Sequence, residues 1–387
     1  MKPQLLDATT LNRATLERQL LLRREPQTPQ QAIYQLIGLQ AQEPASPYLA
    51  LWTRLQEFEA IEFDRVLTER AVLKSTLMRI TLHNVVAEDY PLFYAAMAPS
   101  LRLSRVHDKR FVPAGVSLPD AQALLRETCR FLEQEHTEAD VVAWLASAAN
   151  SQWVKGDAKV AWWALKTFGP WTRVPANFSP DRPWRYPGEL YTLAASPEAV
   201  VAYEVAVQSL LLRFLAAYGP SSAQDFARFT LLRSPVVTAA LKALADRLVT
   251  YHGAEGQTLY DLSEAKLPDP ETPAPARLLP LFDNLLLGHV HSSRVLPAEY
   301  RPRVSRVNGD LLPTVLVDGW VAGVWRVLEG GLEVTAFHKL SDEQWEGVAQ
   351  EAKALLKFLR PRDSRVFFRH HHWWNKGIEG NPRVFTE

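Results

Sequence analysis

Residues 219–262 read GPSSAQDFARFTLLRSPVVTAALKALADRLVTYHGAEGQTLYDL. Serine before a helical pattern, proline at a helix start, and two β-rich runs joined by a glycine-containing turn are signals for two helices and a hairpin. The expected elements are a helix near 197–217, a helix capped by Ser222, a helix over 235–246, and a hairpin of strands 248–251 and 258–262. This order predicts a winged helix-turn-helix.

The same order of elements recurs twice earlier in the chain. The first copy is expected to hold helices over 11–24, from Thr28 to the pair Gln40 and Gln42, over 46–55 and over 59–69, and then a strand over 73–86. The second copy is expected to hold helices near 118–135, 138–147 and 157–168, followed by an extended segment at 171–174. Helices followed by strands in each copy favour three tandem winged helices.

A different pattern follows a proline-rich linker near 268–275. Beyond it, a β-hairpin is expected over 314–327, a strand over 332–337 and an amphipathic helix over 341–359. We therefore predict an α+β fold, with three tandem winged helix-turn-helix units followed by a small C-terminal antiparallel β-sheet or barrel. The expected boundaries are 1–115, 116–195, 196–267 and 268–387.

Composition places the chain among globular proteins. It has 387 residues, of which 47% are hydrophobic and 22% charged, and its formal net charge is zero. A zero net charge argues against coating a polyanion with the whole surface, but allows a local basic groove. The start of the chain does not resemble a signal peptide, and no apolar run is long enough for a membrane span. The single cysteine, Cys129, predicts a reduced cytosolic setting and reads as a buried helix residue.

Motifs for common cofactors and nucleophiles are missing from the sequence. There is no glycine-rich phosphate loop, no nucleophile elbow and no paired-histidine zinc motif. The run His370-His371-His372 has no ligand spacing with cysteines or carboxylates, so we expect a solvent- or phosphate-facing basic tail there rather than a metal site. We expect no metal and no nucleotide cofactor.

Polar residues at three places are candidates for function. The first is the triplet Gln40-Ala41-Gln42, in which two amides at the expected end of a helix could converge on one water. The second is the set Arg79, Thr81 and His83, which would share one face of the expected strand. The third is Asp283, which lies within an apolar run. This pattern alone favours a side chain that caps a helix or forms an ion pair.

Five segments in a fixed order resemble a known family. They are Gly38-Leu39-Gln40-Ala41-Gln42, Arg79-x-Thr81-x-His83, Tyr218-Gly219-Pro220-Ser221-Ser222-x-x-Asp225-Phe226, Leu279-Pro280-x-Phe282-Asp283-Asn284-x-Leu286-Leu287 and Pro313-x-x-Leu316-Val317-Asp318-Gly319-x-x-x-Gly323-x-Trp325-Arg326. Together they resemble the winged-helix DNA-binding family that includes the AlkZ-type DNA glycosylases. The resemblance spans nearly the whole chain, and the family's catalytic signature of two glutamines around an apolar residue matches Gln40-Ala41-Gln42.

The resemblance implies a monofunctional DNA glycosylase that repairs alkylation damage by base excision. Glutamine is a poor general base, but a purine alkylated at N7 is cationic and leaves without a general acid. Gln40 and Gln42 would then hold the attacking water and stabilise positive charge developing on the sugar. The expected partner is double-stranded DNA with alkylated purines or an interstrand crosslink, bound by a monomer in the bacterial cytoplasm at the nucleoid.

Basic and polar side chains would line an open groove for this DNA. The candidate DNA-contacting residues are Arg79, Thr81, His83, Asp283, Arg294, Arg301 and Arg303. Two alternatives stay open from the sequence. One is a non-catalytic winged-helix transcription regulator, although helix 235–246 has few side chains that read bases. The other is a scaffold that binds protein through its winged helices.

Overall fold

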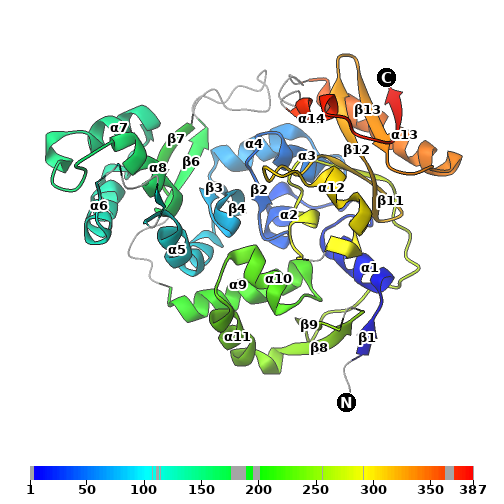
Figure 1. Cartoon of the computed structure of the whole chain (residues 1–387), viewed down its shortest axis with the longest axis horizontal. Coiled ribbons are helices and arrows are strands. Elements are labelled where there is room, and N and C mark those ends of the chain that lie inside the picture. The colour runs from blue at the N-terminus through cyan, green and yellow to red at the C-terminus, as the bar shows by residue number, and fades with distance from the viewer. Residues whose placement is uncertain are drawn as a thin grey trace.

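The computed structural model describes residues 4–106, 108–109, 113, 115–175, 189–194, 201–254, 256–290, 292–361 and 370–386. Figure 1 shows helices and strands gathered around a central region that contains the strand β2. The elements up to α5 are β1 (Gln4–Leu6), α1 (Ala8–Arg18), α2 (Pro29–Gln35), β2 (Leu39–Gln40), α3 (Ser46–Trp52), α4 (Ala60–Thr68), β3 (Val72–Thr76), β4 (Leu82–Val86) and α5 (Tyr90–Val106). The expected cap at Thr28 is confirmed, because its side chain and that of Gln31 form a reciprocal capping box.

The next elements complete a sheet that the first elements began. They are α6 (Leu118–Phe131), β5 (His136–Thr137), α7 (Glu138–Leu145), α8 (Ala158–Phe168), β6 (Trp171–Pro175) and β7 (Glu189–Leu193). The strand order of the six-stranded sheet is β2-β4-β3-β6-β7-β5. Strands from both sides of the expected boundary at 115/116 therefore pair in one sheet.

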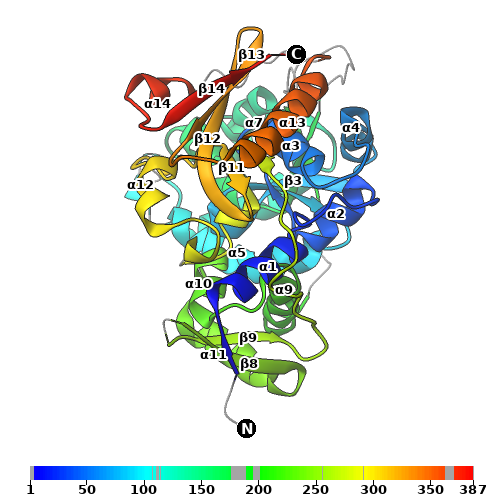
Figure 2. The same cartoon turned by 90° about the vertical axis from the view of Figure 1, so that its right-hand side faces the viewer.

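Three helices and a hairpin follow, in the order predicted for residues 197–262. They are α9 (Tyr203–Tyr218), α10 (Ala223–Thr230), α11 (Ser234–Ala243), β8 (Leu248–Gly253) and β9 (Thr258–Leu262). Ser222 caps α10 through a capping box with Asp225, as its pattern predicts. The N-terminal strand β1 pairs in parallel with β8, so the start of the chain joins this hairpin (Figure 2).

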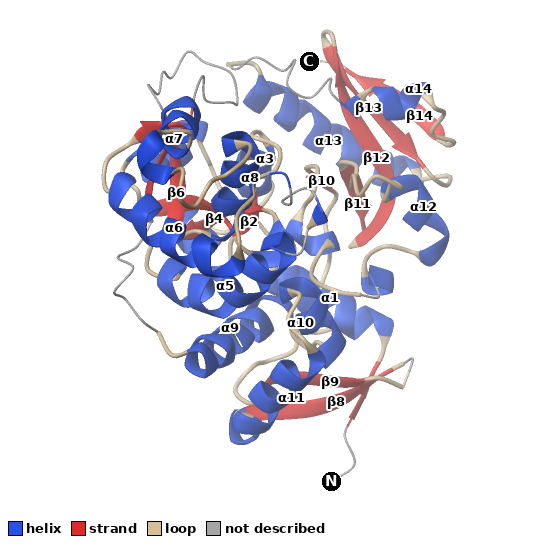
Figure 3. Cartoon of the chain, turned by 60° about the vertical axis from the view of Figure 1, so that its left-hand side comes forward, coloured by secondary structure: helices blue, strands red, loops and turns tan. Residues whose placement is uncertain are grey.

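The C-terminal part is a five-stranded antiparallel sheet with one long helix beside it. Its elements are β10 (Arg277–Leu279), α12 (Arg301–Val304), β11 (Thr314–Val317), β12 (Trp320–Leu328), β13 (Gly331–Ala336), α13 (Asp342–Leu359), α14 (His372–Asn375) and β14 (Asn381–Phe385). The strands pair in the order β10-β11-β12-β13-β14. Figure 3 shows α13 running alongside this sheet. The expected hairpin, the third strand and the amphipathic helix are all confirmed.

The first and last parts of the chain share a hydrophobic core. Tyr48 and Trp52 from α3 belong to the same buried cluster as Trp325 from β12 and Trp345 from α13. The helix α1, near the middle of the molecule in Figure 2, adds polar links to other parts. Its Arg18 forms an ion pair with Asp261 of β9. These contacts join the N-terminal helices to the C-terminal sheet and to the β8–β9 hairpin.

Two local expectations were wrong. The strand expected over 73–86 is a hairpin, because a 3-10 turn at Met78–Ile80 separates β3 from β4. Arg79 and Ile80 both have positive φ angles, which reverse the chain there. The helix α5, which contains Pro99, was not predicted from the sequence. The chain is an α+β protein, and no helix in its described part has the length and hydropathy to cross a membrane.

Candidate active site

A tight turn places Gln40 on a short strand rather than on a helix. The helix α2 ends at Gln35, and the chain then reverses through Ile37 and Gly38, whose φ angles are 58° and 95°. A Cβ atom on Gly38 would lie 2.8 Å from Val85 Cγ1 and 2.9 Å from the Asn84 carbonyl oxygen, so the position requires glycine. The expectation that a helix continues to the glutamine pair is therefore wrong.

Gln40 lies opposite His83 in the antiparallel ladder between β2 and β4. Its side chain is only 6% exposed. Arg79 Nη2 donates a hydrogen bond to Gln40 Oε1 over 2.9 Å and contacts His83 Nε2 over 3.1 Å. The turn at Met78–Ile80 thus brings Arg79 next to Gln40 and His83. The Nη2 atom of Arg79 contacts both of these side chains.

The partners of His83 fix its protonation state. The carbonyl oxygen of Thr81 can only accept, so His83 Nδ1 donates to it over 3.0 Å. The other ring nitrogen then accepts from Arg79. Burial lowers the pKa of His83 to about 3, and the nearby Arg79 guanidinium acts in the same direction. His83 is therefore a neutral imidazole at physiological pH, and it orients Arg79 instead of transferring a proton.

Arg79 is a partly buried cation between this ladder and α10. Its guanidinium lies 4.9 Å from the centre of the Phe229 ring, in a cation–π contact. Burial lowers the pKa of Arg79 to about 10, a value at which it still carries its charge at neutral pH. Arg79 Nη1 is buried and has no hydrogen-bond partner among the described residues. One donor group of this arginine is thus not used by the fold.

Gln42 is exposed, and it contacts the same segment as Gln40. The Leu82 amide donates to Gln42 Oε1 over 3.0 Å. The side-chain oxygens of both glutamines therefore accept hydrogen bonds. Neither carboxamide NH2 group has a hydrogen-bond partner among the described residues. The structure brings Gln40, Gln42, Arg79 and His83 together.

Thr81 joins this group only through its carbonyl oxygen, which accepts from His83 Nδ1. Its hydroxyl donates to the Met78 carbonyl oxygen over 3.1 Å and closes the turn. Arg79 and Thr81 precede β4, so the shared strand face expected for Arg79, Thr81 and His83 is wrong. The turn, and not strand alternation, gathers them.

Asn284 is a further site residue that sequence reasoning did not select. The Gln40 amide donates to Asn284 Oδ1 over 3.3 Å, and Asn284 Nδ2 donates to the Gly38 carbonyl oxygen. The two bonds hold the backbone on both sides of Leu39. The position falls in one of the family-like segments, next to Asp283, but a single asparagine in an apolar run carries no other signal.

Asp283 is fully buried in an ion pair with Arg54. Both oxygens of the carboxylate accept from Arg54, over 2.7 and 2.8 Å, and both side chains are 0% exposed. Asp283 also accepts from the Leu285 amide over 2.9 Å. The capping and ion-paired roles that its pattern favours are both present, and its carboxylate is shielded from the surface.

The candidate arginines divide into one buried and two more accessible side chains. Arg294 is 6% exposed and donates to the Pro220 carbonyl oxygen over 2.9 Å. Burial lowers its pKa to about 10. Arg301 is exposed, at the start of α12. Arg303 lies over the Phe337 ring, at 5.2 Å from its centre, and within 3.6 Å of Glu379.

Arg228 on α10 is an exposed cation that the sequence analysis missed. Arg228 Nη1 donates to the Val290 carbonyl oxygen over 3.2 Å, and Arg301 Nη1 reaches the same oxygen over 3.5 Å. Arg228 is also close enough to Arg79 to contribute to lowering the pKa of that arginine. A line of positive charge therefore runs from the Gln40 contact through Arg228 to Arg301.

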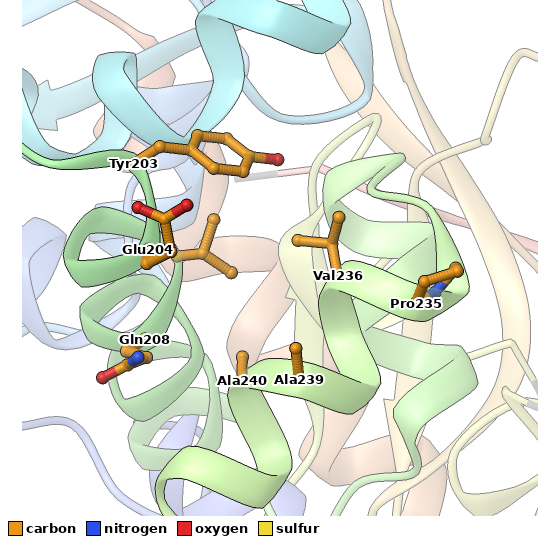
Figure 4. Close-up of a pocket in the computed structure, with 8 residues that line it drawn as sticks. Tyr203, Glu204, Gln208, Pro235, Val236, Ala239 and Ala240 are labelled. Atoms are coloured by element: carbon orange, nitrogen blue, oxygen red, sulfur yellow. The ribbon is translucent and has the colours of Figure 1, made fainter.

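An apolar pocket of about 290 Å³ lies elsewhere, between α9 and α11 (Figure 4). Its wall is formed by Tyr203, Glu204, Val207, Gln208, Pro235, Val236, Ala239 and Ala240. In Figure 4, Val236, Ala239 and Ala240 of α11 face the side chains of α9. Neither glutamine of the triplet lines this pocket, so it is separate from the group around Gln40.

Comparisons with known proteins give the family of this chain. A curated protein named interstrand DNA cross-link repair glycosylase, from Streptomyces sahachiroi, is 26% identical over 354 residues, which cover 87% of this chain and 92% of that protein. The solved structure of Streptomyces sahachiroi DNA glycosylase AlkZ superposes with a TM-score of 0.77 at 24% identity, covering 92% of this chain and 96% of that one. The family model described as DNA glycosylase AlkZ-like matches residues 33–358. The chain belongs to the AlkZ-like family of DNA glycosylases and is a DNA N-glycosylase.

Proposed function

We propose that this glycosylase hydrolyses the N-glycosidic bond of purines that carry a positive charge from alkylation at N7, with a water held by Gln40 and Gln42. The observation that carries the proposal is the contact of both glutamine carbonyls with fixed donors, Arg79 Nη2 and the Leu82 amide. When a donor holds the oxygen of a carboxamide, the NH2 group of that carboxamide points in one fixed direction. On one short segment, one NH2 group can donate to a water that in turn donates to the oxygen of the other glutamine. The second lone pair of this water is then free to attack C1′, and its proton passes to bulk solvent.

The protonation states favour a leaving group that is already activated. His83 is neutral and Arg79 is cationic, so neither offers a general acid of suitable pKa near neutrality. A base alkylated at N7 needs none, because its positive charge weakens the glycosidic bond. Each glutamine oxygen keeps a second lone pair, which can face the oxocarbenium-like sugar as its charge develops. No lysine nucleophile enters this scheme, so the enzyme would be monofunctional.

The DNA would follow the positive charge beside the glutamines. Arg228 and Arg301, both exposed and both at the Val290 carbonyl, would contact backbone phosphates. We further propose that the helix-and-hairpin segments form three winged-helix units, with the C-terminal sheet as a fourth domain. The relative from Streptomyces sahachiroi is named for interstrand cross-link repair, which supports a groove that admits bulky lesions.

The test measures release of N7-methylguanine from duplex DNA under single-turnover conditions. Gln40→Ala and Gln42→Ala should each slow release by about 10- to 1,000-fold, because the water loses one of two ligands. Gln134→Ala, an exposed glutamine of the same chain, is the matched control. Release at the wild-type rate by the double variant would refute the role of the pair, and a wild-type protein that releases no base would refute the substrate class.

A further inference from the structure

Glu43 follows the two catalytic candidates directly but is buried, whereas Gln42 is exposed. Glu43 is 4% exposed. The chain bends at residues 42 and 43, beyond the strand β2, so Glu43 lies beneath the surface that carries Gln42. A contact at Glu43 can therefore hold the segment from behind without touching the substrate.

The residue that lies against Glu43 comes from the far end of the chain. His370 Nε2 is 3.7 Å from Glu43 Oε2, and His370 is 3% exposed. This distance exceeds that of a direct hydrogen bond, so the two buried side chains contact each other without one. The expectation that His370 belongs to a solvent-facing tail is wrong. A buried imidazole costs free energy unless its polar atoms are paired, and the described part of the chain offers neither ring nitrogen a hydrogen bond.

His370 is fixed to the C-terminal part by its surroundings. Three residues later, Trp373 Nε1 donates to Asp310 Oδ2 over 2.8 Å, and the guanidinium of Arg306 lies 5.1 Å from the centre of the Trp373 ring. Burial raises the pKa of Asp310, but hydrogen bonds from Asn308 and Trp373 and the nearby His370 outweigh it and lower the pKa overall. His370 thus connects a segment that is anchored at Trp373 to Glu43, beside the glutamine motif.

We propose that His370 is a positioning residue of the glycosylase reaction, which acts through Glu43 to hold the backbone that carries Gln42. The proposal rests on the function proposed above. Asn284 and the pairing with β4 hold the motif as far as Ala41, whose amide donates to the Leu82 carbonyl oxygen over 2.7 Å, whereas the backbone of Gln42 lies beyond this pairing. The Glu43 contact fixes the next residue, so it limits how far the Gln42 carboxamide can move. A displacement of about 1 Å at a reacting group can cost about 100-fold in rate.

The experiment compares His370→Ala, His370→Gln and the matched control His372→Ala, whose side chain is exposed on the same segment. Release of N7-methylguanine is measured at saturating enzyme, the dissociation constant for the same duplex is measured separately, and circular dichroism gives the melting temperature. His370→Ala should release base about 10-fold more slowly with a dissociation constant within about twofold of wild type. His370→Gln should recover most of the rate, because its amide nitrogen can occupy the position of Nε2 and face Glu43.

A double-mutant cycle with Glu43→Ala tests whether the two residues act together. If His370 acts through Glu43, the double variant should be about as slow as the slower single variant, and not slower by the product of both effects. An unchanged rate in His370→Ala, no recovery in His370→Gln, or additive losses would each overturn the proposal. So would a rate loss fully explained by unfolding or weaker binding. Wild-type protein that releases no base would instead refute the proposed function, so the two failures are distinguishable.

Discussion

Arg79 Nη2 donates to Gln40 Oε1 over 2.9 Å, across a separation of 39 residues in the chain. The same nitrogen contacts the neutral His83, which faces Gln40 in the ladder. The arginine therefore orients a carboxamide by its oxygen, and His83 orients the arginine. Because all three side chains are at least partly shielded from water, the geometry is set before any substrate arrives.

Replacement of this arginine should slow the chemistry more than it weakens DNA binding. In Arg79→Ala, Gln40 loses the donor that fixes its oxygen, so we expect base release to slow by about 10- to 100-fold. Arg79→Lys supplies a charge without the planar fork, and we expect it to recover only a small part of the rate. Single-turnover release at saturating enzyme and DNA affinity are the two measurements.

Arg130→Ala is the control for this change, since Arg130 is exposed on α6 and pairs with Glu127 three residues away. We expect it to match wild type in both measurements. Equal losses of affinity and rate in Arg79→Ala would show that Arg79 serves mainly to bind DNA, and the orienting role would be withdrawn.

The low pKa of His83 predicts how stability depends on pH. His83 takes up a proton near pH 6.5 when unfolded, but only near pH 3 when folded, because burial and Arg79 disfavour its charged form. The neutral folded histidine is thus fully stabilising above about pH 6.5, and stability is lost as the pH falls toward 3. Between about pH 7.5 and about pH 5 the loss should be about 2 kcal/mol from this residue.

Urea denaturation of wild type and His83→Asn at these two pH values checks the prediction. Asparagine retains a donor for the Thr81 carbonyl but does not titrate. The variant should therefore lose less of its unfolding free energy on acidification. Wild type should still lose more than His83 alone explains, because burial also lowers the pKa of His289. Identical pH dependence in the two proteins would contradict the neutral state of His83.

The elements of the fold were readable from local signals, whereas the site was not. Caps at Thr28 and Ser222 and the glycine turn of the β8–β9 hairpin are short-range features, so the sequence predicted them. The reversal at Arg79 depends on two non-glycine residues with positive φ, for which sequence pattern gives no warning. It turned an expected strand into a hairpin and brought Arg79 to Gln40.

The other contacts of the site join residues that are far apart in the sequence, so the sequence pattern did not predict them. Gln40 and Gln42 are neighbours in one short segment and were visible as a pair in the sequence. Their partners Asn284 and Arg79 come from distant parts of the chain. Arg294, Arg301 and Arg303 could not be told apart from the sequence. Burial separates them, since Arg294 pairs with backbone inside the molecule and Arg301 is exposed.

The ion pair of Arg54 and Asp283 should matter more for stability than for DNA binding. Asp283→Ala leaves a fully buried guanidinium without its carboxylate, so we expect a loss of about 3 to 5 kcal/mol in unfolding free energy. Glu127→Ala removes an exposed partner and should cost less than about 1 kcal/mol. Urea denaturation gives both values. Asp283→Ala that is still folded at low temperature should bind DNA as wild type does, and weaker binding there would support a direct contact instead.

The line of charge from Arg79 through Arg228 to Arg301 predicts the salt dependence of DNA binding. Each phosphate contact releases about one counterion, so Arg228→Ala and Arg301→Ala should each reduce the slope of log affinity against log salt by about 0.9. The base-release rate at saturating enzyme should change little, because neither side chain touches the glutamines in this structure. Titration of a fluorescent duplex between about 50 and 200 mM salt gives the slopes, with Arg130→Ala as the exposed control. Unchanged slopes in both variants would place the DNA on another face of the molecule.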